Sequence, residues 1–403
     1  MEKLIDKIDA KLLGSRLAEA RRARGITQQK VADEIGMSRT TVVAIEKGER
    51  RVTSKELLAF ASLYGREVSR LVKPGTANSD FVPEFRKDWS EMLEKVPGAE
   101  AVSSELRAYA EDYADLERLN GIERSDRDIP RYQIRGTSPE QAAEEAAVSE
   151  RNRLGIGDGP ISNLRDRLEM DVGLRVFYFP MPSPISGVFA YSDELGGCVG
   201  INLNHPRDRR HWTLAHEYAH FLTTKYTPEV TMLKGGKRIS ISERFADAFA
   251  ENFLMPASGL NRRFTEVTRS SPHGTTMTEI CQLADLYQVS VQALVLRLEN
   301  LKRIAAGTWE SLRYNGFKPR EAQKVLGIEP DPPVRDELPK WYKKLAVAAY
   351  EQEKISEGQL ARFLRSDRVT ARMLVDAMST NYEERGGEYF SFELNFAQEV
   401  PGR

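Results

Sequence analysis

The stretch Thr213-Leu-Ala-His216-Glu217-Tyr-Ala-His220-Phe-Leu222 decides the fold of the part of the chain around it. It is an apolar, helix-compatible run that contains a His-Glu-x-x-His motif. In an α-helix, positions i and i+4 lie on one face, so His216 and His220 can hold one metal ion together. Glu217 sits beside them, where it can take a proton from a metal-bound water. A bare match to this motif also arises by chance, so its meaning depends on the residues C-terminal to it.

A second helix is predicted over residues 242–255. Ser242 is its expected N-cap, and Pro256 marks its end. Its apolar face consists of Phe245, Ala246, Phe249, Ala250, Phe253 and Leu254. The loop between the two helices is long enough for the second helix to return against the first.

Glu243, at the start of this second helix, is the expected third metal ligand. Three protein ligands leave the fourth position open for water, as in catalytic zinc sites. Asp247, one turn further on, is placed to accept the other ring N–H of a ligating histidine and so to fix its tautomer. Glu251 is the reserve ligand candidate. The alternative is that these carboxylates are solvated charges on an amphipathic helix, and we favour the ligand interpretation because the motif precedes them.

The composition is that of a soluble globular protein of two to four domains, with 403 residues, 40% hydrophobic and 30% charged. No apolar run reaches transmembrane length, and the first residues do not resemble a signal peptide. The two cysteines, Cys198 and Cys281, lie far apart, which argues against a disulfide scaffold and fits a reducing cytoplasm. Each is expected to be a small buried apolar residue.

The charge is unevenly distributed along the chain. Residues 1–73 hold sixteen Lys/Arg and ten Asp/Glu, whereas the remainder holds 43 and 50. A basic N-terminal module on a mildly acidic body indicates that this module alone meets a polyanion.

The basic module is predicted to consist of short helices. Thr27 caps a helix over residues 28–35, Gly36 suits the left-handed turn after it, and Ser38 caps the next helix, over residues 39–46. Another helix is expected from Ser54 to Tyr64. This cadence is that of a helix-turn-helix.

The segment closely resembles the Xre (phage-repressor-like) family, which implies binding to double-stranded DNA as a homodimer. The second helix would lie in the major groove, so Arg39, Thr40 and Thr41 are the expected base-reading residues. The expected phosphate contacts are Gln28, Lys47, Arg50 and Arg51. The alternative is a small protein-interaction domain with a solvated basic face. We favour DNA binding because the glycines, the caps and the charge agree.

The middle of the chain is predicted to mix helices and strands. Helices are expected over residues 89–96, 103–119 and 161–171, and another after the Ser138-Pro139 cap. Strands are expected over residues 174–179, 186–191 and 197–202. A small sheet that backs the His-Glu-x-x-His helix gives an α+β architecture.

The order of these pieces resembles the ImmA/IrrE family of metallopeptidases over about residues 138–300. The pieces are Gly159-Pro160-Ile161, Ser186-Gly187, Asn202, Arg210, residues 216–220, residues 243–256 and the tail over residues 289–301. The resemblance implies a zincin-like fold with a gluzincin-like site. Its metal would be Zn²⁺, with Mn²⁺ as an alternative in vitro, bound by His216, His220 and Glu243 beside the catalytic Glu217.

With the N-terminal module, the match is to the fused Xre–ImmA/IrrE regulators. The resemblance implies a metallo-endopeptidase that cleaves an Xre-type repressor and so derepresses stress or mobile-element genes. Two alternatives stay open. One is a transcription factor that uses the peptidase fold as a metal or ligand sensor without cleavage, and the other is self-cleavage in the stretches 74–80 or 120–137.

Other candidates are weaker. His273 and Tyr191 are possible stabilisers of an oxyanion, but we favour structural roles for both. His205 and His211 are the remaining histidines.

Residues 308–403 are predicted to be helical, over 309–315, 319–326, 340–353, 357–364 and 370–378. The stretch 355–372 has helix-turn-helix cadence, which is compatible with second DNA contacts, a partner surface or a plain helical bundle. We favour the bundle.

The chain is therefore expected to be mainly α, with an all-α N-terminal domain, an α+β metallopeptidase domain and a helical C-terminal domain. The expected division is 1–73 for DNA binding, 74–137 for a helical linker or dimerisation segment, 138–306 for the peptidase and 307–403 for substrate or partner binding. A cytoplasmic protein without membrane contact is expected.

Overall fold

The fold comes from a computed structural model of the chain. It describes residues 9–24, 26–64, 68–72, 98–122, 129–134, 138–192, 194–224, 229–232, 240–270, 275–328, 338–385 and 388–393. The expected helix over residues 89–96 lies outside these ranges, as do the stretch 74–80 and half of the stretch 120–137.

The N-terminal domain is a bundle of short helices. They are α2 (Ala10–Ala23), α3 (Gln28–Ile35), α4 (Arg39–Glu46), α5 (Ser54–Tyr64) and α6 (Val68–Val72). The predicted caps are confirmed: the side chain of Thr27 accepts from the backbone N–H of Lys30, and that of Ser38 accepts from the N–H of Thr41. Gly36 has φ 75°, in the left-handed region that glycine enters at little cost. The predicted helix-turn-helix is therefore present.

A mixed four-stranded sheet forms the centre of the molecule. The strands β1 (Arg175–Phe179), β2 (Ile185–Ser192), β3 (Gly196–Asn202) and β4 (Glu229–Met232) lie in the order β1-β3-β2-β4. β1 runs parallel to β3, and the other pairs are antiparallel. Every residue of β2 and β3 is buried, which explains why their sequences are continuously apolar rather than alternating.

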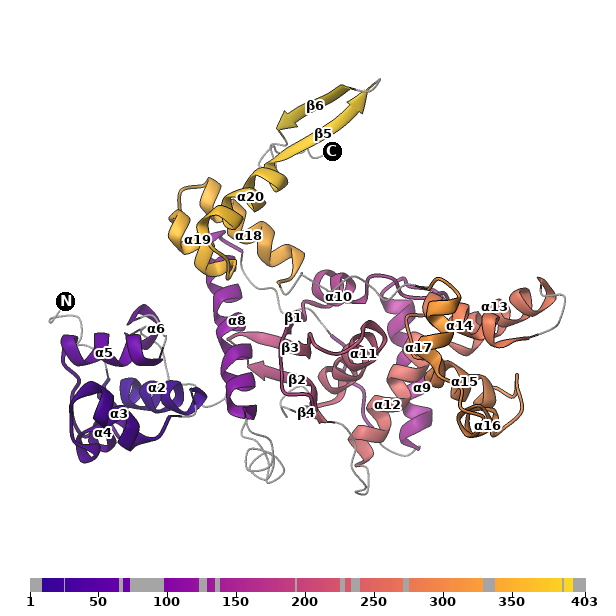
Figure 1. Cartoon of the computed structure of the whole chain (residues 1–403), viewed down its shortest axis with the longest axis horizontal. Helices are drawn as coiled ribbons and strands as arrows, with labels where there is room; N and C mark the ends of the chain where they lie inside the picture. Colours follow the sequence, from indigo (N-terminus) through magenta and orange to yellow (C-terminus); the bar gives the residue numbers. More distant parts are fainter. Residues whose placement is uncertain are drawn as a thin grey trace.

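Helices cover both faces of this sheet (Figure 1). On one face, Phe189 and Ile201 pack into a core with α9 (Pro139–Arg153), α11 (Arg207–Thr224) and α12 (Ile241–Leu254). On the other face, Phe177 and Val188 pack into a second core with α8 (Ala99–Leu119) and α18 (Lys340–Glu351). The His-Glu-x-x-His motif lies on α11, so the first of these layers carries the candidate site.

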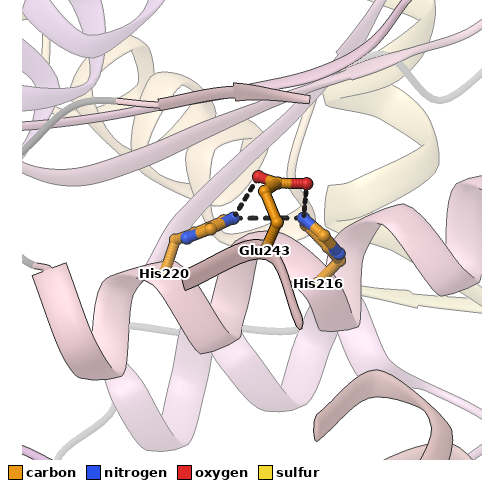
Figure 2. A group of neighbouring side chains, drawn as sticks. All are labelled: His216, His220 and Glu243. Atoms are coloured by element: carbon orange, nitrogen blue, oxygen red, sulfur yellow. Dashed lines mark hydrogen bonds and ion pairs between the residues drawn. The ribbon is translucent and has the colours of Figure 1, made fainter. Parts of the chain in front are cut away.

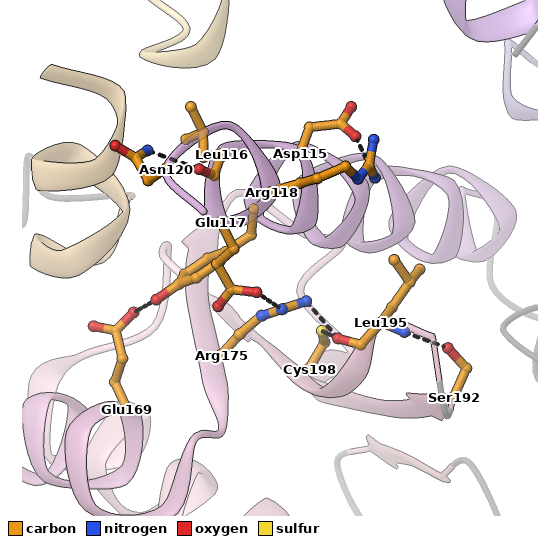
Figure 3. Close-up of polar contacts among 11 residues, drawn as sticks. Asp115, Leu116, Glu117, Arg118, Asn120, Glu169, Arg175, Ser192, Leu195 and Cys198 are labelled. Atoms are coloured by element: carbon orange, nitrogen blue, oxygen red, sulfur yellow. Dashed lines mark hydrogen bonds and ion pairs between the residues drawn. The ribbon is translucent and has the colours of Figure 1, made fainter. Parts of the chain in front are cut away.

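Helix α8 joins three parts of the molecule. Its Tyr109 stacks on Phe177 of β1, with ring centroids 4.9 Å apart. Its Glu117 forms an ion pair with Arg175 of β1 (Figure 3), and the Tyr113 hydroxyl donates to the Glu169 carboxylate at 2.8 Å. The same helix packs against α2 of the N-terminal domain and against α18.

The remaining helices flank the two cores. Helices α13 (Ala257–Ser270), α14 (Met277–Leu286), α15 (Val291–Asn300), α16 (Thr308–Tyr314) and α17 (Pro319–Val325) follow α12. Helices α19 (Glu357–Phe363) and α20 (Arg368–Ser379) follow α18. Both cysteines are buried, as predicted.

Two predicted elements differ from the structure. Residues 161–171 do not form one α-helix: a short α10 (Leu164–Arg167) continues as a π-helix, η1 (Leu168–Val172). The C-terminal region is not only helical, since β5 (Thr380–Arg385) and β6 (Glu388–Glu393) form an antiparallel hairpin. The Gly386-Gly387 dipeptide between two β-prone runs is the signal that could have found it.

Within the described residues, no helix is long and apolar enough to cross a membrane.

Candidate metal centre and nucleic-acid interface

Helix α11 is held firmly at its start and on its reverse face. The Arg210 guanidinium donates to the carbonyl oxygens of Leu203 and His205, at 3.1 and 3.2 Å. On the reverse face, the Tyr218 hydroxyl donates to the fully buried carboxylate of Glu150 on α9. Arg153 completes this network by donating to the Tyr218 oxygen at 3.0 Å. These bonds fix the rotation of α11 and so the direction of its opposite face.

The three predicted metal ligands lie together on α11 and α12 (Figure 2). The Nε2 atoms of His216 and His220 are 3.1 Å apart. The Glu243 carboxylate approaches His220 Nε2 at 3.3 Å and His216 Nε2 at 3.7 Å. Tetrahedral zinc ligands, each about 2.05 Å from the metal, lie about 3.3 Å from one another. The donor set therefore fits one Zn²⁺ ion, with both histidines buried.

Two further side chains orient the histidine rings. Asp247 Oδ1 lies 3.0 Å from His216 Nδ1, so the ring donates there and keeps its Nε2 lone pair for a metal. Ser242 Oγ lies 3.4 Å from His220 Nδ1. Ser242 is not the N-cap of α12, as the sequence suggested. The cap is Ser240, whose side chain accepts from the Glu243 N–H, and Ser242 lies inside the helix facing His220.

The charges of the cluster support one another. Burial alone would raise the pKa of the Glu243 carboxyl, but hydrogen bonds from His216 and His220 outweigh it and hold that pKa well below its usual range. Burial would lower the pKa of His216, and the bonds to Asp247 and Glu243 reverse this and raise it. An anionic Glu243 opposite two ring nitrogens is the electrostatic setting that attracts a divalent cation.

Glu217 lies next to the ligands, beneath strand β2. Its side chain is fully buried. A Cβ on Gly187 would lie 2.7 Å from Glu217 Oε1 and 2.7 Å from the Thr213 methyl group, so only glycine fits at this point of β2. The sheet is thus packed directly onto the helix face that carries the motif.

Other candidates for this site lie elsewhere. Glu251, the reserve ligand, contacts Arg297 at 3.6 Å and is not part of the cluster. Tyr191 is buried in the core beside Phe221. His211 bonds Gln288 at 2.9 Å on α11's other side, and burial lowers its pKa to about 4. His205 contacts the Ser183 carbonyl, and His273 lies outside the described residues.

The expected DNA-reading residues lie at the exposed start of α4. Arg39 and Thr40 are exposed and Thr41 is partly buried, and both threonine hydroxyls contact Ser38 Oγ, at 2.7 and 2.8 Å. Lys47 and Arg51 are also exposed.

Two of the residues expected to contact phosphates also form hydrogen bonds within the domain. Gln28 donates to Glu46 at 2.8 Å, and Arg50 donates to Glu56 at 2.8 Å. Glu46, which also accepts two bonds from Arg21 at 2.6 and 3.0 Å, thus joins three helices. Sequence reasoning overlooked it because a Glu at the end of a helix gives no sign of a buried partner.

Comparisons with known proteins also distinguish the N-terminal helical domain from the domain that carries the metal-ligand cluster. Residues 17–71 match the family described as helix-turn-helix, and residues 169–299 match the family described as IrrE N-terminal-like domain. No curated protein matches the chain.

Two solved structures show only distant likeness. One is PlcR from Bacillus thuringiensis in complex with the peptide PapR7 and DNA: identity is 13%, 92% of this chain and 96% of that chain are covered, and the TM-score is 0.17. The other is ComR from Streptococcus suis, with 11% identity, coverage of 92% and 90%, and a TM-score of 0.16. Scores this low do not establish a shared fold. The two family matches show that the chain is a fusion of an Xre-type helix-turn-helix domain with an IrrE/ImmA N-terminal-like domain.

Proposed function

We propose that this chain is a DNA-binding regulator whose IrrE-like domain is a zinc-dependent endopeptidase. The observation that carries the proposal is the cluster of His216, His220 and Glu243, with Glu217 buried beside it. A purely structural metal site would be closed by four protein ligands, whereas the described residues supply three here.

In the proposed hydrolysis of a peptide bond, the residues of the cluster have separate roles. A divalent ion held by the three ligands would supply Lewis-acid activation of water and of the peptide carbonyl. Glu217 takes the proton of the attacking water and passes it to the leaving amine. Asp247 holds the His216 ring in the tautomer that presents Nε2, and Ser242 contacts the His220 ring on its Nδ1 side.

The proposed substrate is an Xre-type repressor, or this chain itself, so that cleavage derepresses stress or mobile-element genes. The exposed start of α4 supports DNA binding in the same chain, with Arg39, Thr40 and Thr41 toward bases and Lys47 and Arg51 toward phosphates. We further propose that the protein binds a palindromic site as a homodimer in the cytoplasm.

The test is intact-protein mass spectrometry of the zinc-loaded chain with the Xre-type repressor encoded nearest to it. Wild type and Glu217→Gln are compared, since this substitution keeps the ligand set and removes the base. Zinc-dependent fragments with wild type alone support the proposal and identify the cut. Equal cleavage by both proteins would exclude Glu217 as the base.

A second candidate function is a regulator in which ligand binding at the peptidase fold changes DNA affinity without cleavage. Helix α8 favours it, because Arg107 contacts Glu19 of the DNA-binding domain at 3.5 Å while Tyr109 and Glu117 contact the sheet. If operator affinity changed with zinc in Glu217→Gln, and no chain were cut, this function would replace the first.

A further inference from the structure

Arg209 lies on the same face of α11 as the metal ligands. The helical spacing from Arg209 through Thr213 to His216 and His220 places these residues along one stripe. At about 1.5 Å per residue, the Cα of Arg209 lies about 10 Å from that of His216 along the helix axis. Arg209 therefore lies about two helical turns from His216, on the helix face that carries the proposed metal ligands.

A residue of strand β2 forms a hydrogen bond with this arginine. Arg209 Nη2 donates to Ser186 Oγ at 3.1 Å. Ile185 and Val188 both pack in the core on the α8 side of the sheet, so two residues rather than one lie between them, and the pairing of β2 with β4 shifts at this point. A bulge of this kind re-aims a side chain, here the hydroxyl of Ser186 toward α11.

The same bulge brings the arginine close to the catalytic group. Ser186 is followed directly by Gly187, whose missing side chain leaves room for the Glu217 carboxylate and the Thr213 methyl group. The guanidinium thus lies one strand position, about 3.3 Å, from the point where β2 touches Glu217. The Cα of this arginine lies about 10 Å from that of His216 along the helix axis. Measured along an extended peptide, these two distances correspond to one to three residues from the scissile bond.

Arg209 donates to a neutral oxygen, as the buried Arg151 does, and not to a carboxylate. Arg107, Arg153 and Arg175 each form an ion pair with a glutamate. No carboxylate of the described residues forms an ion pair with Arg209, whose hydrogen bond is to a neutral hydroxyl. Burial lowers the pKa of its guanidinium, partly offset by the nearby charge of Asp208. A partly desolvated guanidinium that forms no ion pair with a described carboxylate is well placed to bind an anion supplied by a ligand.

We propose that Arg209 is a specificity-determining residue that binds the carboxylate of an Asp or Glu side chain in the peptide substrate. This inference rests on the proposed endopeptidase function and adds the chemical class of the substrate segment. Arg209 binds and positions the peptide and takes no part in the proton transfers of Glu217.

The test uses binding rather than turnover. Fluorescent peptide hydroxamates, which anchor on a zinc ion, are made in two series that extend to either side of the anchor. Each series places Glu or Gln at positions one to four. Affinities for the zinc-loaded full chain are measured by fluorescence anisotropy at low salt. At one position within three residues of the anchor, the Glu probe is expected to bind wild type about tenfold tighter than the Gln probe.

Two substitutions of Arg209 distinguish the effect of its charge from the effect of the guanidinium's shape. Arg209→Gln is expected to abolish the Glu preference while zinc stoichiometry and melting temperature stay unchanged. Arg209→Lys is expected to retain part of it, since an ammonium keeps the charge and loses the guanidinium's fork. Arg207→Gln is the matched control, because Arg207 is an exposed arginine on the first turn of the same helix, and this variant should keep the full preference.

The outcomes distinguish the proposed role of Arg209 from the proposed endopeptidase function. Probes that bind equally well with Glu and Gln, or a preference that survives in Arg209→Gln, would overturn the role of Arg209 and leave the endopeptidase proposal intact. Failure of every probe to bind a chain that holds zinc would overturn both, because peptide would then not bind at the metal.

Discussion

In the helix-turn-helix domain, the residues that we propose contact DNA come from one short helix and its flanks, and Arg39, Thr40, Lys47 and Arg51 are exposed. In the proposed metal centre, the candidate ligands come from two helices, and His216, Glu217 and His220 are almost completely buried. The first site is a surface whose side chains need only a stable helix beneath them. The second is a cluster of polar side chains inside a core. Such side chains need hydrogen-bond partners that fix their orientation.

The difference shows where each region is vulnerable. The surface that we propose faces DNA is supported by a largely buried ion pair between Arg21 and Glu46. The proposed metal centre depends on the packing of α11 against α12 and on the bond between Tyr218 and Glu150 behind α11. Substitutions can therefore disable one region while leaving the other measurable in the same chain.

The largest expected effect is on the N-terminal domain. Glu46→Ala removes the carboxylate that pairs with Arg21, whose side chain is only 13% exposed. Removing one partner of a buried pair costs about 3–5 kcal/mol, so this domain should unfold and lose DNA binding while zinc is still bound. Urea unfolding and operator gel shifts measure this. Glu34→Ala, an exposed position on α3, is the control, and an equal loss in both variants would contradict the prediction.

The next effect is on the metal centre. If about 10 kcal/mol of zinc binding is shared among three protein ligands, each contributes about 3 kcal/mol. Glu243→Gln should therefore weaken zinc binding a few hundredfold without affecting DNA binding. Competition with a fluorescent chelator measures the affinity. Glu251→Gln is the matched control on the same helix, and weaker zinc binding there would revive Glu251 as a ligand.

A smaller effect is a pH dependence of the free energy of unfolding, which we expect in the domain that contains His211 and not in the N-terminal domain. Burial lowers the pKa of His211 to about 4 from its ordinary value of 6.5, so the unfolded chain binds this proton more readily. The stability that the neutral ring contributes is present above pH 6.5 and is lost as pH falls toward 4. Between pH 7.5 and 5, the expected loss is about 2 kcal/mol.

Metal-free wild type and His211→Asn, compared by denaturant unfolding at both pH values, test this. The variant should lose less stability on acidification, and an equal loss would rule out His211 as the source. The N-terminal domain contains no histidine, so its own unfolding should not show this component.

The smallest effect is on DNA recognition. Arg39→Ala removes an exposed side chain at the start of α4, with no buried contact to lose. Operator affinity should fall about tenfold, with unchanged folding and zinc binding. Anisotropy titrations with operator and scrambled DNA measure it. A loss that is equal for both DNAs would assign Arg39 to phosphate rather than base contact.

Local rules in the sequence were sufficient for the N-terminal domain and for the pairing of His216 with His220. Capping residues, a glycine turn and i to i+4 spacing act over a few residues, so α3 and α4 were predicted to their exact bounds. The same rules misplaced the cap of α12, since Ser240 and Ser242 are equally good caps by sequence, and only the position of His220 shows which of them faces the site.

Tertiary structure decided the remainder. Which carboxylate on α12 faces the histidines depends on how that helix is rotated against α11, and this distinguishes Glu243 from Glu251. The need for glycine at position 187 and the aim of Ser186 toward Arg209 arise from a bulged strand packed on a helix. Such contacts join residues far apart in the chain, and their geometry is set by the packing of two cores rather than by the preference of any short segment.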